Sequence, residues 1–78
     1  MDFTYVLQSE DNVHFYTGVT DNLWTRLARH NEGRIPDTSK WRPWKLKTYI
    51  AMSDRKRAFE LEKYLKSHSG RAFLKKHL

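Results

Sequence analysis

The sequence predicts an α+β domain, a small sheet with helices packed on it, with its elements in the order ββαβαα. Three segments alternate apolar and polar side chains, which is the period of a β-strand. Three other segments carry helix-start signals or apolar residues at helical spacing. At 78 residues, without an internal repeat, the chain is expected to form one domain over residues 1–78.

The first nineteen residues are expected to form a β-hairpin. Residues 3–8 and 13–19 both alternate, and the residues 9–12 between them are turn formers. The polar residues that follow the hairpin offer an N-cap, so a helix is predicted over residues 23–32. Gly33 stands where a left-handed residue commonly ends a helix.

The second half of the chain begins with an irregular segment, residues 34–44, which contains two prolines. The strand period returns in residues 46–52. Asp54, directly after a serine, is expected to cap a helix that runs to about Lys66. A short final helix is predicted over residues 69–78.

The composition favours a polyanionic partner. The formal charge is +6 and the pI is about 9.8, and cations that neutralise phosphates gain affinity through counterion release. A soluble protein that is merely basic is the alternative, but lysine and arginine begin only at Arg26, which favours a binding face. The chain has no cysteine, no apolar run of membrane length and no signal-peptide pattern, so a cytoplasmic location is expected.

Glu62 is the sharpest single candidate for a functional residue. On a helical wheel it falls inside the apolar arc that includes Ala58 and Leu65, whereas Glu60 points the other way. A buried carboxylate without a partner costs several kcal/mol, so a metal or a cation should compensate it. The alternatives are an ion pair with Arg26 or a lysine, and a position at the rim of the core.

Arg26 and His30 are four residues apart and therefore share one flank of the first helix. The planar guanidinium of an arginine suits a phosphate, and His30 could carry a proton or bind phosphate. A solvated helix flank is the simpler interpretation of these two residues. Arg29, on the same helix, is a further candidate for contact with nucleic acid.

Tyr5 and Tyr16 are placed on neighbouring strands of the hairpin, where cross-strand side chains meet. A phenol needs nearby positive charge to act as a base, and Arg26 or a metal would supply it. Both tyrosines could equally be structural, since tyrosine is common in strands. Gly18 would allow a phosphate or another backbone to approach closely, or it simply relieves a strand end.

Two further regions offer contacts for a nucleic acid. Lys40, Trp41 and Arg42 lie in the proline-flanked loop, where an indole beside a guanidinium suits stacking on bases. Alternatively the loop tryptophans cover the core, which is the preferred interpretation for Trp44. Arg55 begins a basic run that either faces phosphate or is a solvated helix end. Without a separate recognition domain, binding is expected to show little sequence preference.

The candidate residues occur in motifs that resemble the GIY-YIG nuclease superfamily. The resemblance covers essentially the whole chain and is greatest to small stand-alone bacterial proteins with this domain. The first motif keeps Tyr5 but lacks the usual glycine and isoleucine, and the second has Thr17 in place of isoleucine. The matching motifs are Phe3-Thr4-Tyr5, Tyr16-Thr17-Gly18, Asn22-Leu23-Trp24-Thr25-Arg26-Leu27, His30-Asn31-Glu32-Gly33, Arg42-Pro43-Trp44, Glu62-Lys63-Tyr64-Leu65-Lys66 and Ser69-Gly70-Arg71-Ala72-Phe73-Leu74.

The resemblance implies a three-stranded antiparallel sheet and a site that hydrolyses DNA phosphodiesters with one Mg²⁺ or Mn²⁺. It assigns Glu62 as the metal ligand and Arg26 as the clamp on the scissile phosphate. Tyr5 and Tyr16 would position or deprotonate the attacking water, and His30 would assist. Which tyrosine acts as the base is left open.

Three functional interpretations follow. The preferred one is a metal-dependent endonuclease that acts on DNA, including branched DNA, with a role in repair or recombination. The second is a catalytically silent nucleic-acid-binding module of the same fold, which would have no need of a carboxylate at the phosphate site. The third is an accessory protein whose basic face docks an acidic protein. A homodimer is compatible with all three.

Overall fold

The computed structural model describes residues 1–78 and contains three strands and three α-helices. The strands form one antiparallel sheet in the order β2-β1-β3, which confirms the α+β class and the ββαβαα order. The elements are β1 (Asp2–Ser9), β2 (Phe15–Thr20), α1 (Leu23–Asn31), the short 3-10 helix η1 (Ser39–Trp41), β3 (Trp44–Met52), α2 (Arg55–Lys66) and α3 (His68–His77). No helix has the length and apolar character needed to cross a membrane.

The central strand β1 carries the residues that connect the sheet to both helical layers. In the β1–β2 register Tyr5 lies opposite Gly18 and Leu7 lies opposite Tyr16. Tyr5 and Tyr16 are thus diagonal neighbours on one face of the hairpin, not directly opposed residues. Along β1, side chains alternate between the faces, so Thr4 and Val6 point away from Tyr5.

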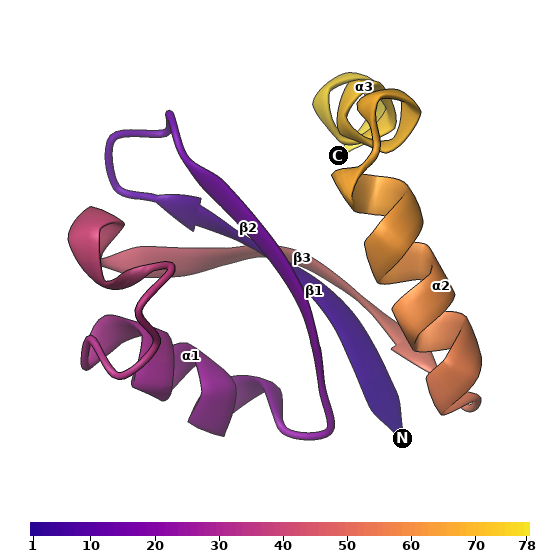
Figure 1. Ribbon diagram of the computed structural model, residues 1–78, viewed down its shortest axis with the longest axis horizontal. Coiled ribbons are helices and arrows are strands. Elements are labelled where there is room, and N and C mark those ends of the chain that lie inside the picture. Colours follow the sequence, from indigo (N-terminus) through magenta and orange to yellow (C-terminus); the bar gives the residue numbers. More distant parts are fainter.

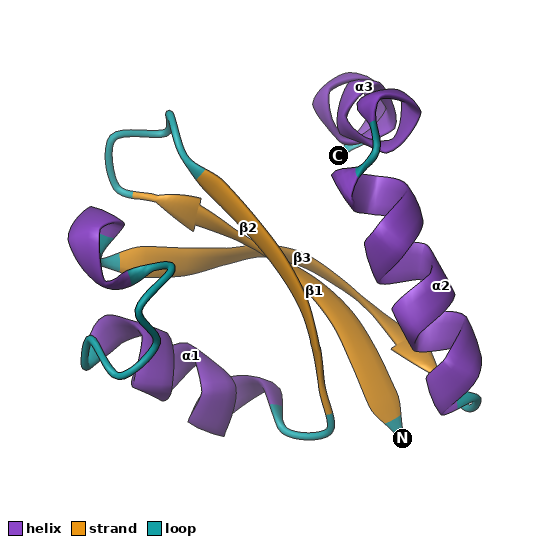
Figure 2. Cartoon of the chain, viewed as in Figure 1, coloured by secondary structure: helices purple, strands orange, loops and turns teal.

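The helices cover opposite faces of the sheet, with α1 on one side and α2 with α3 on the other (Figures 1 and 2). The face with Tyr5 packs against α1, where Tyr5, Leu7 and Trp44 form the buried cluster. On the other face the hydroxyl of Thr4 donates a hydrogen bond of 2.8 Å to the carbonyl of Ala58 on α2. The two layers meet the sheet independently, so residues of α1 and α2 can approach the same strand edge from both sides.

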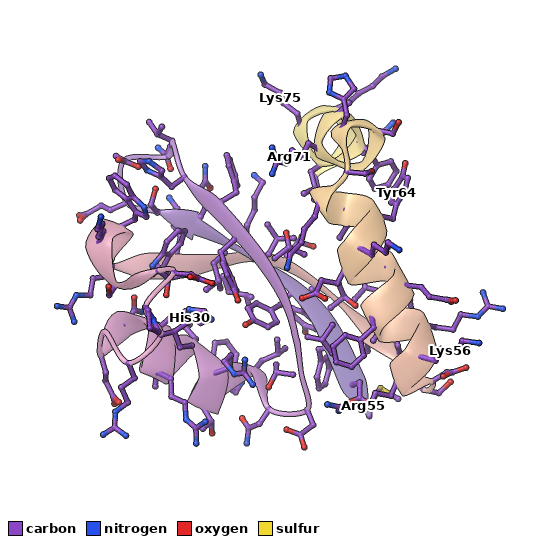
Figure 3. All side chains as sticks on the ribbon, in the orientation of Figure 1. His30, Arg55, Lys56, Tyr64, Arg71 and Lys75 are labelled. Carbon is purple, nitrogen blue, oxygen red and sulfur yellow. The ribbon has the colours of Figure 1, made fainter.

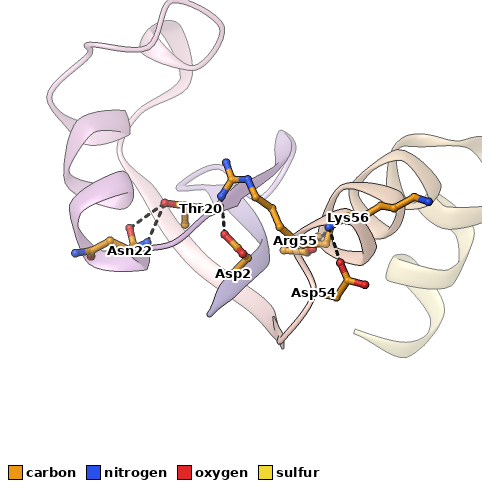
Figure 4. A network of polar contacts seen from close by, with 8 residues as sticks. Asp2, Thr20, Asn22, Asp54, Arg55 and Lys56 are labelled. Atoms are coloured by element: carbon orange, nitrogen blue, oxygen red, sulfur yellow. Dashed lines mark hydrogen bonds and ion pairs between the residues drawn. The ribbon is translucent and has the colours of Figure 1, made fainter.

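Helix starts are fixed by side-chain caps. The side chain of Asn22 accepts from the Thr25 N–H at 3.1 Å, and that of Asp54 accepts from the Lys56 N–H at 2.9 Å, as Figure 4 shows for Asp54. In the same view Arg55 pairs with Asp2 at 2.6 Å and ties α2 to the start of β1. The predicted start of α3 at residue 69 is wrong by one residue because Ser67 provides the cap, so the helix begins at His68.

The segment between α1 and β3 is less irregular than predicted. It includes η1, and Trp44 is already the first residue of β3. Trp44 is buried, and its indole N–H donates to the carbonyl of Thr38 at 2.9 Å. The side chain of Asn31 bonds both backbone groups of Trp44. The interpretation of Trp44 as a core residue is therefore confirmed, and the loop is held against the end of α1.

Candidate active site

A buried hydrogen-bond chain runs from the sheet through α1 to the following loop. The hydroxyl of Tyr5 lies 3.0 Å from Nε2 of His30, and Nδ1 of His30 lies 2.7 Å from the hydroxyl of Thr38. The Thr38 hydroxyl is in turn 3.3 Å from the carbonyl of Ile35. In that bond the hydroxyl must be the donor, because a carbonyl oxygen can only accept. His30 Nδ1–H then donates to Thr38, and the unprotonated Nε2 accepts from the Tyr5 hydroxyl.

This chain is consistent with a neutral imidazole. His30 is fully buried. Its burial, and secondarily the positive charge of Arg26, lower the pKa of His30 to about 4. The enclosed imidazole exposes no surface to solvent, and phosphate binding by His30 stays a prediction. A role for His30 in assisting the reaction would have to act through Tyr5.

Tyr5 is also held in its neutral form. Burial raises the pKa of the Tyr5 phenol to about 12, with further increases from Tyr16 and Glu62, while Arg26 opposes them. Of these three groups, Tyr16 has its ring centroid 6.4 Å from that of Tyr5. Groups on α1, β2 and α2 therefore all affect the ionisation of the Tyr5 phenol.

Gly18 is buried, and its lack of a side chain makes room for the Tyr5 ring. A Cβ at this position would lie 2.6 Å from the Tyr5 hydroxyl oxygen and 2.7 Å from Cζ. This observation gives Gly18 a packing role beneath the site. Contact of Gly18 with nucleic acid stays a prediction.

Tyr16 differs from Tyr5 in its access to solvent. It is half-buried, whereas Tyr5 is 1% exposed. The Tyr16 ring lies 4.9 Å from the His30 ring and 6.4 Å from the Tyr5 ring, measured between centroids. On its other side the ammonium of Lys66 is 5.9 Å from the ring centroid. Tyr16 is thus the phenol of the pair that water can reach.

Glu62 is half-buried on α2 and pairs with a lysine one turn further along. The distance from Lys66 Nζ to Glu62 Oε2 is 3.3 Å, and 22% of the Glu62 side chain is exposed. An ion pair with a lysine was among the alternatives for Glu62, and the structure contains one. The Glu62 oxygens remain open to solvent on one side.

The donor set near Glu62 fits one kind of metal site. No group of three or more His, Cys, Asp or Glu side chains that could hold a metal ion is present. Mg²⁺ commonly keeps several waters and takes one or two carboxylates together with substrate phosphates. A single accessible carboxylate therefore fits a hydrated ion that DNA would help to hold.

Arg26 is half-buried beside a hollow of about 320 Å³ that Arg29, Arg34 and Ile35 also line. The guanidinium of Arg34 pairs with Glu32 at 2.8 Å, and Arg29 is exposed. The predicted placement of Arg26 and Arg29 on one helix brings both to this hollow. It has the size and charge for a phosphate.

The other predicted contacts for nucleic acid lie away from Tyr5. Trp41 is 43% exposed, and one face of its indole is already stacked on the His14 ring, with 3.8 Å between centroids. Lys40 and Arg42 are exposed in the same loop. Arg55 is engaged with Asp2. These residues are not gathered with the five catalytic candidates, and their contact with nucleic acid stays a prediction.

Two residues at the site were missed by the sequence reasoning. Thr38 carried no signal, because an isolated threonine in a loop is common. Lys66 stood in the motif around Glu62, and its spacing of four residues was a usable sign of a pair with Glu62. Thr38 contacts His30 and Lys66 contacts Glu62, and the sequence had identified both of these partners. Thr38 and Lys66 therefore complete the immediate surroundings of the candidate site.

Comparisons with known proteins agree with the observed fold. The model of the GIY-YIG catalytic domain matches residues 1–76. The chain is also similar to the UPF0213 protein BH0048 from Bacillus halodurans, whose solution NMR structure superposes with a TM-score of 0.55. That match has 26% sequence identity and covers 95% of this chain and 82% of that chain. No curated protein sequence matches. GIY-YIG domains are nuclease domains, generally dependent on a divalent metal. The chain therefore belongs to the GIY-YIG family.

Proposed function

We propose that this protein is a metal-dependent endonuclease that hydrolyses DNA phosphodiesters with little sequence specificity. The observation that carries the proposal is the position of Tyr16, whose ring lies 6.4 Å from the Tyr5 ring and 5.9 Å from the ammonium of Lys66, the partner of Glu62. Arg26 is one turn before His30 on α1, and the His30 ring lies 4.9 Å from the Tyr16 ring. A fixed cation, a water-accessible phenol and a carboxylate around one point are the groups that phosphodiester hydrolysis requires. Action during DNA repair or recombination is compatible with such an activity.

Each exposed group has a distinct task in this proposal. Arg26 binds the scissile phosphate and opposes the negative charge that grows on it during attack. Tyr16 positions the attacking water and, once its own hydroxyl proton has gone to solvent, accepts a proton from that water as the phenolate. Tyr5 is not suited to this task, because it is enclosed and its pKa is raised to about 12. Tyr5 and His30 hold the surrounding groups in place and do not exchange protons with substrate.

Glu62 would hold the metal, either Mg²⁺ or Mn²⁺. When bound, the ion adds positive charge beside the phosphate and stabilises the departing oxygen. The Lys66 ammonium has to move away from Glu62, or share it, for the ion to bind. Lys66 is half-exposed, so the side chain can swing into solvent at little cost.

The expected substrate is DNA, read through its backbone. The formal charge of +6 suits a polyanion, and the arginine hollow beside Arg26 offers a second place for a phosphate. Contacts to phosphates fix position but carry no sequence information directly. Low sequence specificity follows from this mode of binding.

A catalytically silent binding module is the second candidate. The observation in its favour is the Glu62–Lys66 ion pair, which occupies the one carboxylate that a metal would need. In such a module Arg26 would still bind phosphate. DNA binding would be retained, but no metal would support cleavage.

The test is nicking of supercoiled plasmid with Mg²⁺ or Mn²⁺ by wild type, Glu62→Gln and Glu60→Gln. Glu60 lies on the exposed side of the same helix, where its partner is Arg57 at 3.9 Å, so it is a matched control. Loss of one group that stabilises transition-state charge costs about 10²–10³ in rate. We expect that loss for Glu62→Gln, with DNA binding intact, and near wild-type rates for Glu60→Gln. Equal rates in the two variants would reject the site. Binding without cleavage by wild type would favour the silent module.

A further inference from the structure

A groove of about 680 Å³ lies between the sheet and the C-terminal helix, on the side opposite α1. Its walls come from the hairpin, from the end of α2 and from α3. Val6, Leu65 and Leu74 are among the apolar residues that line it. The groove is distinct from the arginine hollow on α1.

The groove is strongly and uniformly basic. Lys47, Lys66, Arg71 and Lys75 line it from three different elements, and no aspartate or glutamate does. Figure 3 shows Arg71 and Lys75 on the α3 helix above the sheet. Four cations on a surface without acidic side chains favour a polyanion through counterion release.

The apolar lining identifies which polyanion fits. Phe15, at the start of the edge strand β2, is 51% exposed, and the ammonium of Lys47 lies 5.9 Å from its ring centroid. Basic grooves with an exposed aromatic ring bind single strands, because unpaired bases stack on rings while phosphates meet the cations. A duplex would present phosphates alone and leave the apolar lining unmatched.

The groove continues into the candidate active site. Tyr16 and Lys66 line both: Lys66 pairs with Glu62 at 3.3 Å and its ammonium faces the Tyr16 ring at 5.9 Å. A strand that follows the groove therefore ends beside the groups that would cut it. This continuity links what the groove binds to where cleavage would occur.

We propose that the groove binds a single-stranded segment of DNA that flanks the phosphodiester to be cut. Preferred substrates would then be duplexes with a flap or another unpaired flank. The inference rests on the proposed nuclease function for its place in the reaction, but binding to the groove can be measured without any cleavage.

The first experiment measures binding in EDTA, where metal-dependent cleavage is suppressed. Fluorescence anisotropy follows a labelled single-stranded oligonucleotide and a blunt duplex of the same sequence between about 50 and 200 mM salt. The groove variant is Arg71→Gln/Lys75→Gln. The control is Lys63→Gln/Lys76→Gln, which removes the same charge from exposed residues of α2 and α3 outside the groove.

The groove variant should bind the single strand at least about tenfold more weakly. Its slope of log affinity against log salt should fall by about 1.4, since each phosphate contact to a single strand contributes about 0.7. The affinity of the control variant for the single strand, and that of the groove variant for the duplex, should change much less. Equal losses of single-strand affinity in the two variants would overturn the proposal. An equal loss of affinity for the duplex in the groove variant would also overturn it. So would displacement of the oligonucleotide by poly-glutamate at equivalent charge, which would indicate an acidic protein partner.

The second experiment compares cleavage of a flapped duplex with cleavage of the blunt duplex. Wild type should prefer the flapped substrate, and the groove variant should lose this preference while still cutting the blunt duplex. A wild-type enzyme without any preference would overturn the inference and leave the nuclease proposal intact. Absence of all cleavage would instead refute the nuclease proposal. The binding data would still decide whether the groove binds single-stranded DNA.

Discussion

The buried imidazole of His30 makes the stability of this protein sensitive to acid in a calculable way. His30 is fully enclosed between Tyr5 and Thr38, and its pKa is lowered from the ordinary 6.5 to about 4. In the unfolded chain the imidazole takes up a proton near pH 6.5. Between these two values the unfolded state binds more protons, so the free energy of unfolding falls as the pH falls.

The magnitude follows from the interval between the two pKa values. A difference of about 2.5 pH units, at about 1.4 kcal/mol per unit, corresponds to about 3 kcal/mol. The contribution of the neutral His30 to the free energy of unfolding is complete above pH 6.5, declines as the pH falls, and is lost below about pH 4. Roughly 2 kcal/mol should already be lost at pH 5. For a domain of this size that is a large part of the total stability.

The assay is urea unfolding at several pH values from 7 to 4.5, with wild type compared to His30→Gln. Glutamine does not titrate, so the other ionisable groups cancel in the difference between the two pH profiles. His68→Gln is the control, because it removes an exposed histidine at the start of α3. Between pH 7 and 5 the free energy of unfolding of wild type and of His68→Gln should fall by about 2 kcal/mol more than that of His30→Gln. Parallel profiles for all three proteins would refute the assignment of a buried neutral imidazole.

Three further predictions concern neighbours of the same site. Thr38→Val keeps the side-chain shape but leaves the His30 N–H without an acceptor, so it should cost about 1–3 kcal/mol in urea unfolding; a smaller cost than Ser39→Ala would contradict it. Gly18→Ala should cost about 1–3 kcal/mol and lower activity, because the added Cβ collides with the Tyr5 ring; an unchanged melting temperature would refute the collision. Lys66→Gln should lower the Mn²⁺ concentration for half-maximal nicking about two- to fivefold, since an exposed ion pair is worth about 0.2–1 kcal/mol; a higher requirement would contradict competition between the ammonium and the metal.

The elements of the fold could be predicted from the sequence because each has a local cause. Alternation located the strands. Asp54 caps the helix that it was expected to cap, and Asn22 is the one of the polar residues after the hairpin that caps α1. The start of α3 was misplaced because serines at 67 and 69 are equally good caps in isolation. Only the packed chain shows that the Ser67 side chain accepts from the Gly70 N–H at 3.1 Å.

The site was predictable by residue type but not by environment. The sequence named Tyr5 and Tyr16 as a pair, and helical spacing put Arg26 and His30 on one flank. It could not distinguish the enclosed tyrosine from the accessible one, because that difference arises when α1 closes over the sheet. For the same reason Thr38, which is distant from Tyr5 in sequence, gave no sign of its contact with His30.

The two hydrogen bonds of His30 explain why a titratable side chain occupies this buried position. A leucine there would not make the protein sensitive to acid. His30 is one turn from Arg26 on α1, and its two hydrogen bonds tie that helix to β1 and to the loop after it. An apolar side chain would fill the space but would leave the Tyr5 hydroxyl buried without an acceptor. The imidazole therefore joins α1 to β1 and to the loop after the helix, and sensitivity to acid is the consequence of burying it there.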